Sequence, residues 1–362
     1  MAAFGQLVTG PPGAGKTTYC HGMHQFLTAL HRPVHIINLD PAVEDPPYPC
    51  AVNITDLITL PQIMEEHKLG PNGAMLYAME YLEANFDWLE EELERASEGE
   101  ERGSRYFIFD TPGQVELWTN HESLKRIVAK LTKADYRLAA VHLSDAHYIT
   151  DAAKYISVLL LALRAMLQLE LPHVNVLSKM DLITQYGELP FNLEYYTEVQ
   201  DLSYLESALT TTRSTARFAS LNRAICNLVE DYSLVSFETL AVEVCSDCLG
   251  FLKQSRNQVL MGYGLEREKD KQSMLKLLRL LDRVVGYAYI PRLTAAAAGD
   301  TTKMTEEEAI KAYPLPQLTG VQDVADVQEK WVDNRRGWEE WEAAEQKERQ
   351  KERRAGGKEG SG

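Results

Sequence analysis

The sequence predicts an α/β fold with a doubly wound, mostly parallel sheet. Short apolar runs occur without strict alternation of apolar and polar residues, which is typical of strands whose two faces are both covered by helices. Helical patterns separate these runs, and a β-α-β-α order favours parallel strands joined by crossover helices. The expected strands are residues 6–9, 34–38, 106–109, 138–143 and 173–177.

Helices and one more strand are expected between and after these runs. Periodicity predicts helices at about 15–30, 56–68, 74–95, 153–169 and 273–286, and a short apolar run at 234–237 predicts a sixth strand. Two of these helices form an insertion at about 54–96. The residues between them, Gly70-Pro71-Asn72-Gly73, are expected to be a connecting turn, because glycine and proline are stop signals for helices.

The chain is expected to form one domain over residues 1–292, with an atypical insert at about 244–268. The tail at 293–362 has a low-complexity Ala run, then nearly balanced charges and few aliphatic residues. It buries too little apolar surface to offset the entropy of ordering, so we expect a tail that is disordered or forms a lone solvated helix. Three tryptophans in it would share one face of a helix and suit a partner: Trp331, Trp338 and Trp341.

Composition narrows the possible functions. The 362 residues carry 37 Lys and Arg against 53 Asp and Glu, a net charge of −16. This balance excludes a general nucleic-acid binder, because phosphate backbones attract clustered Lys and Arg. Five irregularly spaced cysteines predict a reducing compartment. With no targeting segment visible, and with the most apolar run at 156–163 too short to span a bilayer, we expect a soluble cytosolic or nuclear protein without a membrane partner.

Residues 10–17, Gly-Pro-Pro-Gly-Ala-Gly-Lys-Thr, match the phosphate-binding pattern G-x-x-x-x-G-K-[ST] in full. The motif follows an expected strand and opens an expected helix, as this pattern requires. Glycines let successive N–H groups point at a phosphate, the lysine bridges phosphates, and the hydroxyl that follows binds Mg²⁺. The expected nucleotide-binding residues are Gly13, Ala14, Gly15, Lys16, Thr17 and Thr18, of which Thr17 is also a metal ligand.

A second motif, Asp110-Thr111-Pro112-Gly113-Gln114, follows the expected strand at 106–109. An acidic residue at the end of a neighbouring strand is placed to hold the Mg²⁺ shell, so we expect Asp110 to be the other metal ligand. Gly113 can bring its N–H close to a γ-phosphate, and a loop with that contact changes state on hydrolysis. The pattern is weak alone and becomes specific with the phosphate loop upstream.

A third motif, Ser178-Lys179-Met180-Asp181, ends the expected strand at 173–177 and completes the nucleotide-binding set. The corresponding GTPase motif is Asn-Lys-x-Asp, whose aspartate accepts hydrogen bonds from guanine N1–H and N2–H₂. Adenine lacks both donors, so such a site discriminates strongly against it. Lys179 is expected to stack on the base through its aliphatic stem. Ser178 stands where the motif has asparagine, and its hydroxyl is shorter than the amide.

Together these motifs resemble those of the GPN-loop GTPase family. The resemblance extends to Gly-Pro-Asn at 70–72, to Asn-Leu-Asp-Pro-Ala at 38–42 and to Asp-Thr-Pro-Gly-Gln-Val-Glu at 110–116. It covers about residues 4–243 and resumes near 269–290. Three stretches are most similar to the second of the three eukaryotic paralogues of the family: 77–85, 140–143 and 195–199.

The resemblance implies a fold of P-loop NTPase type and a GTPase that hydrolyses GTP to GDP with Mg²⁺. It also implies a homodimer, or a heterodimer with other GPN-loop paralogues, in which each GPN loop reaches the partner's nucleotide site. Asn72 would then be a catalytic residue supplied in trans, while Asp40, Gln114 and Glu116 match the family positions that orient the attacking water.

The resemblance further implies a biological role. RNA polymerase subunits and chaperone assemblies are the implied partners, in the assembly and nuclear import of RNA polymerase II and also of RNA polymerase III. A cytoplasmic protein that shuttles to the nucleus is therefore expected.

Three departures from the family pattern stand out. Asn53 occupies a position where aspartate is usual, and Thr239 replaces a proline in the loop at 236–240 that resembles a guanine-edge loop. The insert at 244–268 has no counterpart in the family pattern, so it is either a surface extension or an intron read through in the gene model. Its Cys245 and Cys248 lack the second pair or nearby His that a zinc site needs.

Other functions stay open on the residues alone. A nucleotide-gated assembly scaffold with slow or incidental hydrolysis would account for the lack of an obvious catalytic arginine near the motifs. A P-loop kinase would need an Arg-rich lid, for which Arg213 and Arg217 are the candidates, although they also suit an ordinary helix face. A nucleotide-binding ATPase would be separated from a GTPase by its preferred substrate.

Overall fold

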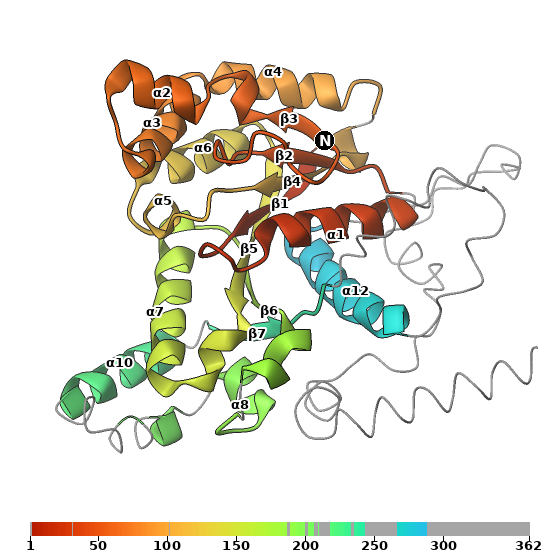
Figure 1. Cartoon of the computed structure of the whole chain (residues 1–362). Helices are drawn as coiled ribbons and strands as arrows, with labels where there is room; N and C mark the ends of the chain where they lie inside the picture. The colour runs from red at the N-terminus through yellow and green to blue at the C-terminus, as the bar shows by residue number, and fades with distance from the viewer. Residues whose placement is uncertain are drawn as a thin grey trace, which may run out of the picture.

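The computed structural model describes residues 2–30, 32–100, 102–186, 189–199, 202–205, 209, 218–232, 235–242 and 266–287 (Figure 1). The expected tail at 293–362, with its three tryptophans, lies outside these residues. So do Arg213, Arg217, Cys245 and Cys248, and all but the last three residues of the expected insert at 244–268.

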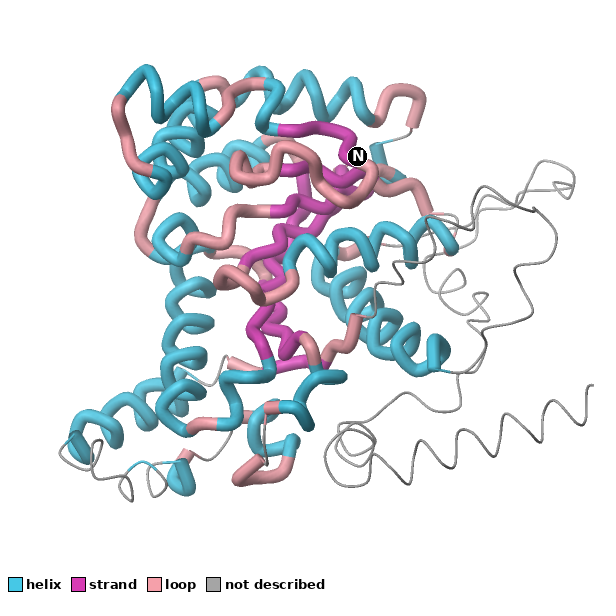
Figure 2. Tube along the Cα trace, viewed as in Figure 1, coloured by secondary structure: helices cyan, strands magenta, loops and turns pink. Residues whose placement is uncertain are grey.

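A seven-stranded parallel sheet forms the centre of the molecule, in the order β3-β2-β4-β1-β5-β6-β7 (Figure 2). β1 pairs with β4 on one side and with β5 on the other, so the chain winds outward in both directions and the predicted fold class is confirmed. The strands are β1 (Ala3–Thr9), β2 (His35–Asn38), β3 (Cys50–Asn53), β4 (Tyr106–Asp110), β5 (Tyr136–Asp145), β6 (His173–Ser178) and β7 (Phe237–Thr239).

Five of the predicted strands are confirmed, with small differences at their ends. β3 was not predicted, because it is a four-residue edge strand with a single buried residue, Val52. The strand predicted at 234–237 was misplaced, since β7 begins at Phe237.

Helices cover both faces of the sheet, and alternate residues of β1, β2, β4 and β5 enter separate cores. Phe4 and Val8 of β1 pack with α1 (Lys16–Ala29) and α12 (Glu266–Val285), which lie side by side in Figure 1. Leu7 faces the opposite core, which is covered by α3 (Pro71–Ala84), α4 (Phe86–Ala96), α5 (Val115–Thr119), α6 (Glu122–Lys133) and part of α7 (Ala152–Leu169).

A third core lies at the β7 edge of the sheet. There the rest of α7 packs against β6 and β7 together with α8 (Leu193–Glu198) and α10 (Ala219–Tyr232). Short 3₁₀ turns connect several of these elements: η1 (Ile54–Asp56), η2 (Arg102–Ser104), η3 (Ala146–Thr150) and η4 (Met180–Gln185).

α7 is long and apolar enough to span a membrane by length and composition alone, within the part of the chain that the structure describes. It continues through Arg164, so it is longer than the apolar run at 156–163, which by itself is too short to span a bilayer. Eight of its residues are buried, among them Tyr155, Leu159 and Ala162 in the third core. A core helix passes the same test of length and hydropathy.

The predicted boundaries within the insertion were wrong. The helix expected at 56–68 is η1 followed by α2 (Leu60–His67). Gly70 is the N-cap of α3, and Pro71 and Asn72 belong to its first turn rather than to a connecting turn. Proline suits the first helical position because its ring fixes a helical φ and the missing N–H would have no helical partner. The helix expected at 74–95 is interrupted at Asn85.

Arg32 fastens α12 to the rest of the domain. Its guanidinium donates two hydrogen bonds to the carboxylate of Asp282, at 2.7 and 3.0 Å. The same group lies over the rings of Tyr106 and Tyr287, at 4.9 and 4.2 Å from their centroids. Because Arg32 follows the end of α1 and is 4% exposed, the ion pair holds together the two helices that cover this face of the sheet.

Replacing Asp282 tests this fastening. Asp282→Ala leaves the guanidinium of Arg32 buried without its counter-charge, so we expect the free energy of unfolding to fall by about 3–5 kcal/mol. Urea denaturation at neutral pH measures this change. The control, Lys125→Ala, removes an exposed ion pair to Glu170, for which we expect a loss below about 1 kcal/mol. Equal losses for the two variants would contradict a fastening role for Arg32.

Candidate nucleotide-binding site

The expected site residues lie along one edge of the sheet. In a parallel sheet all strands end on the same side, and the loops that follow them form a continuous edge. Loops after β1, β2, β4, β5 and β6 meet here, and every expected site residue except Asn72 lies in one of them, at the end of a strand or in the helix that follows. Asn72 comes from the insertion.

The phosphate loop joins β1 to α1. Gly15, the N-cap of α1, has φ +88°, and no side chain caps the helix. The first N–H groups of α1 are therefore available to an anion, as the phosphate-binding motif predicts. A Cβ added to Gly10 would lie 2.3 Å from the carbonyl oxygen of Leu143, so only glycine fits at the start of the loop.

Lys16 is buried at the first position of α1. Its ammonium donates to the carbonyl oxygen of Gly10 at 3.1 Å, and lies 3.4 Å from that of Pro11. A Cβ built on Gly113 would be 2.9 Å from Lys16 Nζ, so the loop after β4 passes directly over the ammonium group. Burial lowers the pKa of Lys16, and the neighbouring carboxylates of Asp110 and Asp40 oppose this change.

Asp110 is buried at the end of β4, 2% exposed. Its Oδ2 accepts a hydrogen bond from the hydroxyl of Tyr48 at 2.9 Å. Burial raises the pKa of this carboxyl to about 6, although Tyr48, Thr17 and Lys16 all lower it. The carboxyl is thus held in a place where its charge is poorly solvated.

Thr17 and Asp110 fit a divalent cation. Asp110 Oδ1 is buried and has no hydrogen-bond partner among the described residues, and the Thr17 hydroxyl lies near the same carboxyl. Hard oxygen ligands beside bound phosphates are the donors that Mg²⁺ takes. The described residues contain no cluster of three or more His, Cys, Asp or Glu that could bind a metal alone, so this cation would share its ligands with the nucleotide.

Asp40 opens the loop after β2. Its Oδ1 accepts a hydrogen bond from the N–H of Ala42 at 2.9 Å, and its own N–H donates to Asn38 Oδ1 at 3.0 Å. The Asn38 amide also donates to Asn53 Oδ1 at 2.9 Å. Asn53, where the family pattern usually has aspartate, therefore helps to fix this loop. Burial raises the pKa of Asp40, against the effect of nearby Lys16.

Ser178 joins the third motif to the phosphate loop. Its hydroxyl donates to the carbonyl oxygen of Ala14 at 2.8 Å and lies 3.1 Å from that of Ser144. The short side chain is thus fully used within the protein, and it connects the end of β6 to the turn that precedes α1.

Lys179 and Asp181 flank this connection. Lys179 has φ +60°, and its ammonium donates to Asp145 Oδ2 at 2.7 Å. Its Cε lies 4.0 Å from a Cβ built on Gly15, so its aliphatic stem runs alongside the phosphate loop. Asp181 is half-buried in the first turn of η4, while Met180 is buried and its N–H donates to Leu240 O at 3.3 Å.

The insertion meets the site through Asn72. Its side-chain oxygen accepts a hydrogen bond from Gln114 Nε2 of the same chain, at 3.0 Å. Gln114 is the N-cap of α5, and Glu116 is exposed in the first turn of that helix. The exposed rim of the site thus carries two amides in contact, those of Asn72 and Gln114, and the carboxylate of Glu116.

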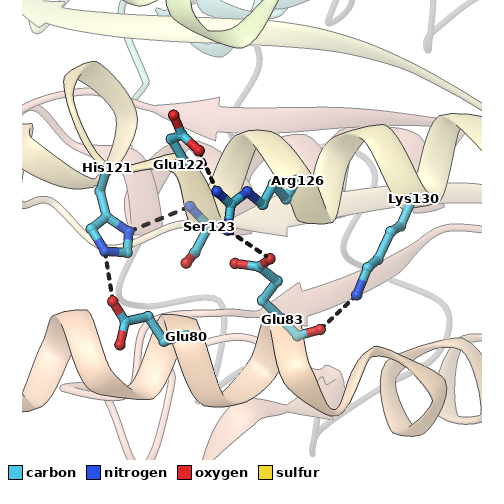
Figure 3. Close-up of polar contacts among 7 residues, drawn as sticks. All are labelled: Glu80, Glu83, His121, Glu122, Ser123, Arg126 and Lys130. Atoms are coloured by element: carbon cyan, nitrogen blue, oxygen red, sulfur yellow. Dashed lines mark hydrogen bonds and ion pairs between the residues drawn. The ribbon is translucent and has the colours of Figure 1, made fainter.

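Polar contacts hold α3 against α6 (Figure 3). His121 Nε2 is 3.1 Å from Glu80 Oε1, Arg126 donates to Glu83 Oε1 at 3.4 Å, and Lys130 donates to the carbonyl oxygen of Glu83 at 2.7 Å. The Asn72–Gln114 hydrogen bond joins the insertion directly to the loop at 111–114. The contacts between α3 and α6 join the insertion to a helix that follows this loop.

Sequence reasoning missed two residues of the site. Asp145, at the end of β5, pairs with Lys179. Like Asp110, it is an acidic residue just after the end of an expected strand, which is a signal visible in the sequence. Tyr48 gave no such signal, because it lies in a loop rich in proline and is 62 residues from its partner Asp110 in the sequence.

Comparison with known proteins agrees with the motifs. Residues 8–259 match a family described as conserved hypothetical ATP binding protein. GPN-loop GTPase 2 of Danio rerio is 51% identical over 286 residues, 79% of this chain and 82% of that protein. GPN-loop GTPase 2 of Schizosaccharomyces pombe is 42% identical over 340 residues, 94% of each. The crystal structure of an apo GTPase from Pyrococcus abyssi has a TM-score of 0.58 at 22% identity, over 78% of this chain and 98% of that one, which supports the fold alone.

The raised pKa of Asp110 predicts a cost in stability. Its ordinary value is 3.8 and its value in the folded chain is about 6, so the folded state holds this proton more tightly and stability falls as pH rises through that window. At pH 7, without Mg²⁺ or nucleotide, the cost approaches about 3 kcal/mol. We expect Asp110→Asn to raise the free energy of unfolding by up to this amount.

Urea denaturation of Asp110→Asn at pH 7 and at pH 4 measures the effect. The gain in stability should shrink below about 1 kcal/mol at pH 4, where the carboxyl in the native chain is protonated. Asp87→Asn, at an exposed position in α4, should change stability by less than about 0.5 kcal/mol. A destabilised Asp110→Asn at pH 7 would contradict the charge cost at this position.

Proposed function

We propose a mechanism and a role for this chain from the premise that it belongs to the GPN-loop GTPase family and is a GTP hydrolase. The observation that carries the mechanism is the hydrogen bond from Ser178 to Ala14, at 2.8 Å. It brings the motif that resembles a guanine-binding sequence against the loop that resembles a phosphate-binding one. A single nucleotide with a guanine base and a phosphate chain suits both.

Base recognition is assigned to Asp181, with Lys179 beside it. A carboxylate accepts hydrogen bonds from the two donors on the edge of guanine, and adenine would leave it unpaired. The stem of Lys179 lies alongside Gly15, which suits a contact with the face of the base or sugar. Its ion pair with Asp145 holds it there.

The phosphates are assigned to the N-terminus of α1 and to Lys16. The uncapped N–H groups of α1 offer donors to phosphate oxygens. In the described structure the Lys16 ammonium binds carbonyl oxygens of its own loop and lies under Gly113, so it stands between the two loops that would enclose a γ-phosphate. Thr17 and Asp110 would hold Mg²⁺, which supplies positive charge to the phosphates as the bond to the leaving group breaks.

Water orientation is assigned to Asp40, Gln114 and Glu116. Phosphoryl transfer depends mainly on positioning and charge stabilisation, so a carboxylate and an amide near the attacking water are sufficient. One oxygen of Asp40 is fixed by the N–H of Ala42, which leaves the other to accept a proton from water. Its raised pKa favours that role, because a base works best with a pKa closer to the working pH.

The chain is proposed to act as a dimer in which Asn72 of each protomer completes the other's site. Asn72 is exposed at the rim beside Gln114, a position from which a neutral amide can stabilise developing charge, although more weakly than an arginine does. The dimer is either a homodimer or a pair with a paralogue of the family.

The biological role follows from the family resemblance alone. We propose participation in the assembly and nuclear import of RNA polymerase II and, by extension, RNA polymerase III. RNA polymerase subunits and chaperone assemblies would be the partners, and the protein would be cytoplasmic with passage into the nucleus.

Nucleotide preference tests the base assignment. Removing the carboxylate in Asp181→Ala deletes two hydrogen bonds to a charged acceptor, so we expect GDP affinity to fall at least about a hundredfold, with a smaller change for ADP. Calorimetry with the purified full chain measures both. Asp87→Ala, far from the motifs in α4, should bind GDP as the unmodified chain does. Wild-type protein that binds ADP as tightly as GDP would reject guanine recognition by Asp181.

Mixing two inactive variants tests the shared site. Asp40→Ala lacks the water-orienting carboxylate but retains Asn72, while Asn72→Ala has the reverse defect. If Asn72 acts in trans, an equal mixture forms mixed dimers with one complete site, so GTP turnover should recover to about a quarter of the wild-type rate. If Asn72 serves its own chain through Gln114, the mixture stays as inactive as either variant, which would overturn the trans assignment.

A further inference from the structure

The loop between β2 and β3 is held near its start by Asn38 and Asn53, and near its end by the buried side chain of Tyr48. Among residues 42–49, which are otherwise exposed or half-buried, only Tyr48 is buried, 5% exposed. Tyr48 belongs to the apolar core that also contains Val8, Cys20 and Ile36, on the face of the sheet that α1 and α12 cover. From there its hydroxyl reaches the end of β4 and donates to Asp110 Oδ2 at 2.9 Å.

This contact makes the two carboxylate oxygens of Asp110 unequal. Oδ2 is engaged by Tyr48, while Oδ1 is buried and has no hydrogen-bond partner within the described ranges. A carboxylate held at one oxygen cannot rotate freely about its side-chain bonds, so the other oxygen keeps a fixed direction. The Thr17 hydroxyl lies near this carboxyl.

We propose that Tyr48 is a positioning residue that holds Asp110 so that its free oxygen faces the cation bound with the nucleotide. Outer-shell hydrogen bonds to metal-ligating carboxylates commonly fix their orientation in this way. Tyr48 also stands in the same loop as Asp40, eight residues further along the chain. Its hydrogen bond thus couples the position of the loop that contains Asp40, the proposed water-orienting residue, to the position of Asp110, the proposed ligand of the cation.

A tyrosine hydroxyl is well suited to this task. A phenolic hydroxyl is protonated at neutral pH, so Tyr48 donates this hydrogen bond and the carboxylate of Asp110 accepts it. The inference rests on the proposed binding of Mg²⁺ with a guanine nucleotide. The test below distinguishes a failure of the role of Tyr48 from a failure of nucleotide binding itself.

The test compares the full-length wild-type chain with Tyr48→Phe, which keeps the buried ring and removes only the hydroxyl. Mn²⁺ titrated into the GDP complex is followed by electron paramagnetic resonance, and GDP affinity is measured separately in EDTA. We expect Mn²⁺ affinity to fall about tenfold while GDP affinity in EDTA is unchanged. Unchanged Mn²⁺ affinity, or an equal loss of GDP affinity without metal, would overturn the inference.

Tyr155→Phe is the matched control. Its hydroxyl is also buried and donates to the carbonyl oxygen of Tyr196 at 2.8 Å, in the core at the other edge of the sheet. It should bind Mn²⁺ and GDP as the wild-type chain does. A wild-type chain that binds no guanine nucleotide would instead refute the proposed function itself.

A measurement on the unmodified chain covers the case in which Tyr48→Phe fails to fold. Hydrogen exchange of the amides of residues 42–49 is compared for GDP with Mg²⁺ and for GDP with EDTA. The inference predicts slower exchange when Mg²⁺ is present, because the cation fixes Asp110 and hence the tyrosine that anchors the loop. Equal exchange in the two conditions would contradict it.

Discussion

The carboxyl end of a parallel sheet is a meeting point, because every strand stops at the same edge and every loop must leave from there. In this chain the uncapped N-terminus of α1, the buried Lys16 and the carboxylates of Asp40 and Asp110 lie at that edge. The two carboxylates repel each other when both are charged. Lys16 lies between Asp110 and Asp40 and opposes the rise in the pKa of both. Tyr48 holds Asp110, and the N–H of Ala42 holds Asp40.

The loops are held by side chains that do no chemistry themselves. Ser178 ties the end of β6 to the phosphate loop, Asn38 fixes the loop that begins at Asp40, and Asp145 restrains Lys179. Each of these bonds joins the end of one strand to the end of another strand or to the loop that follows it. Burial removes part of the solvation of each charge, which lowers the free energy of unfolding of the protein without ligand. A bound nucleotide and cation would raise that free energy again. Such trade-offs between stability and function are common in binding sites.

Local signals in the sequence were enough for the core of the fold and for the motifs. The phosphate loop, the strand runs and the acidic strand ends depend on neighbours in the chain, so they could be predicted. β3 could not, because a short edge strand with only Val52 buried carries almost no pattern. Pro71 was interpreted as a break between helices, although proline also begins helices. The Tyr48–Asp110 and Asn72–Gln114 hydrogen bonds join residues 62 and 42 apart, and only the folded chain brings them together.

The place of α12 has a consequence for biosynthesis. α1, which follows the phosphate loop, shares its core with Met274, Leu277 and Leu281 of α12, the last described helix. Arg32, just after α1, pairs with Asp282 of the same helix. A ribosome delivers these partners after the rest of that face has emerged. The nascent chain therefore exposes the apolar residues of this face that α12 covers until α12 is released.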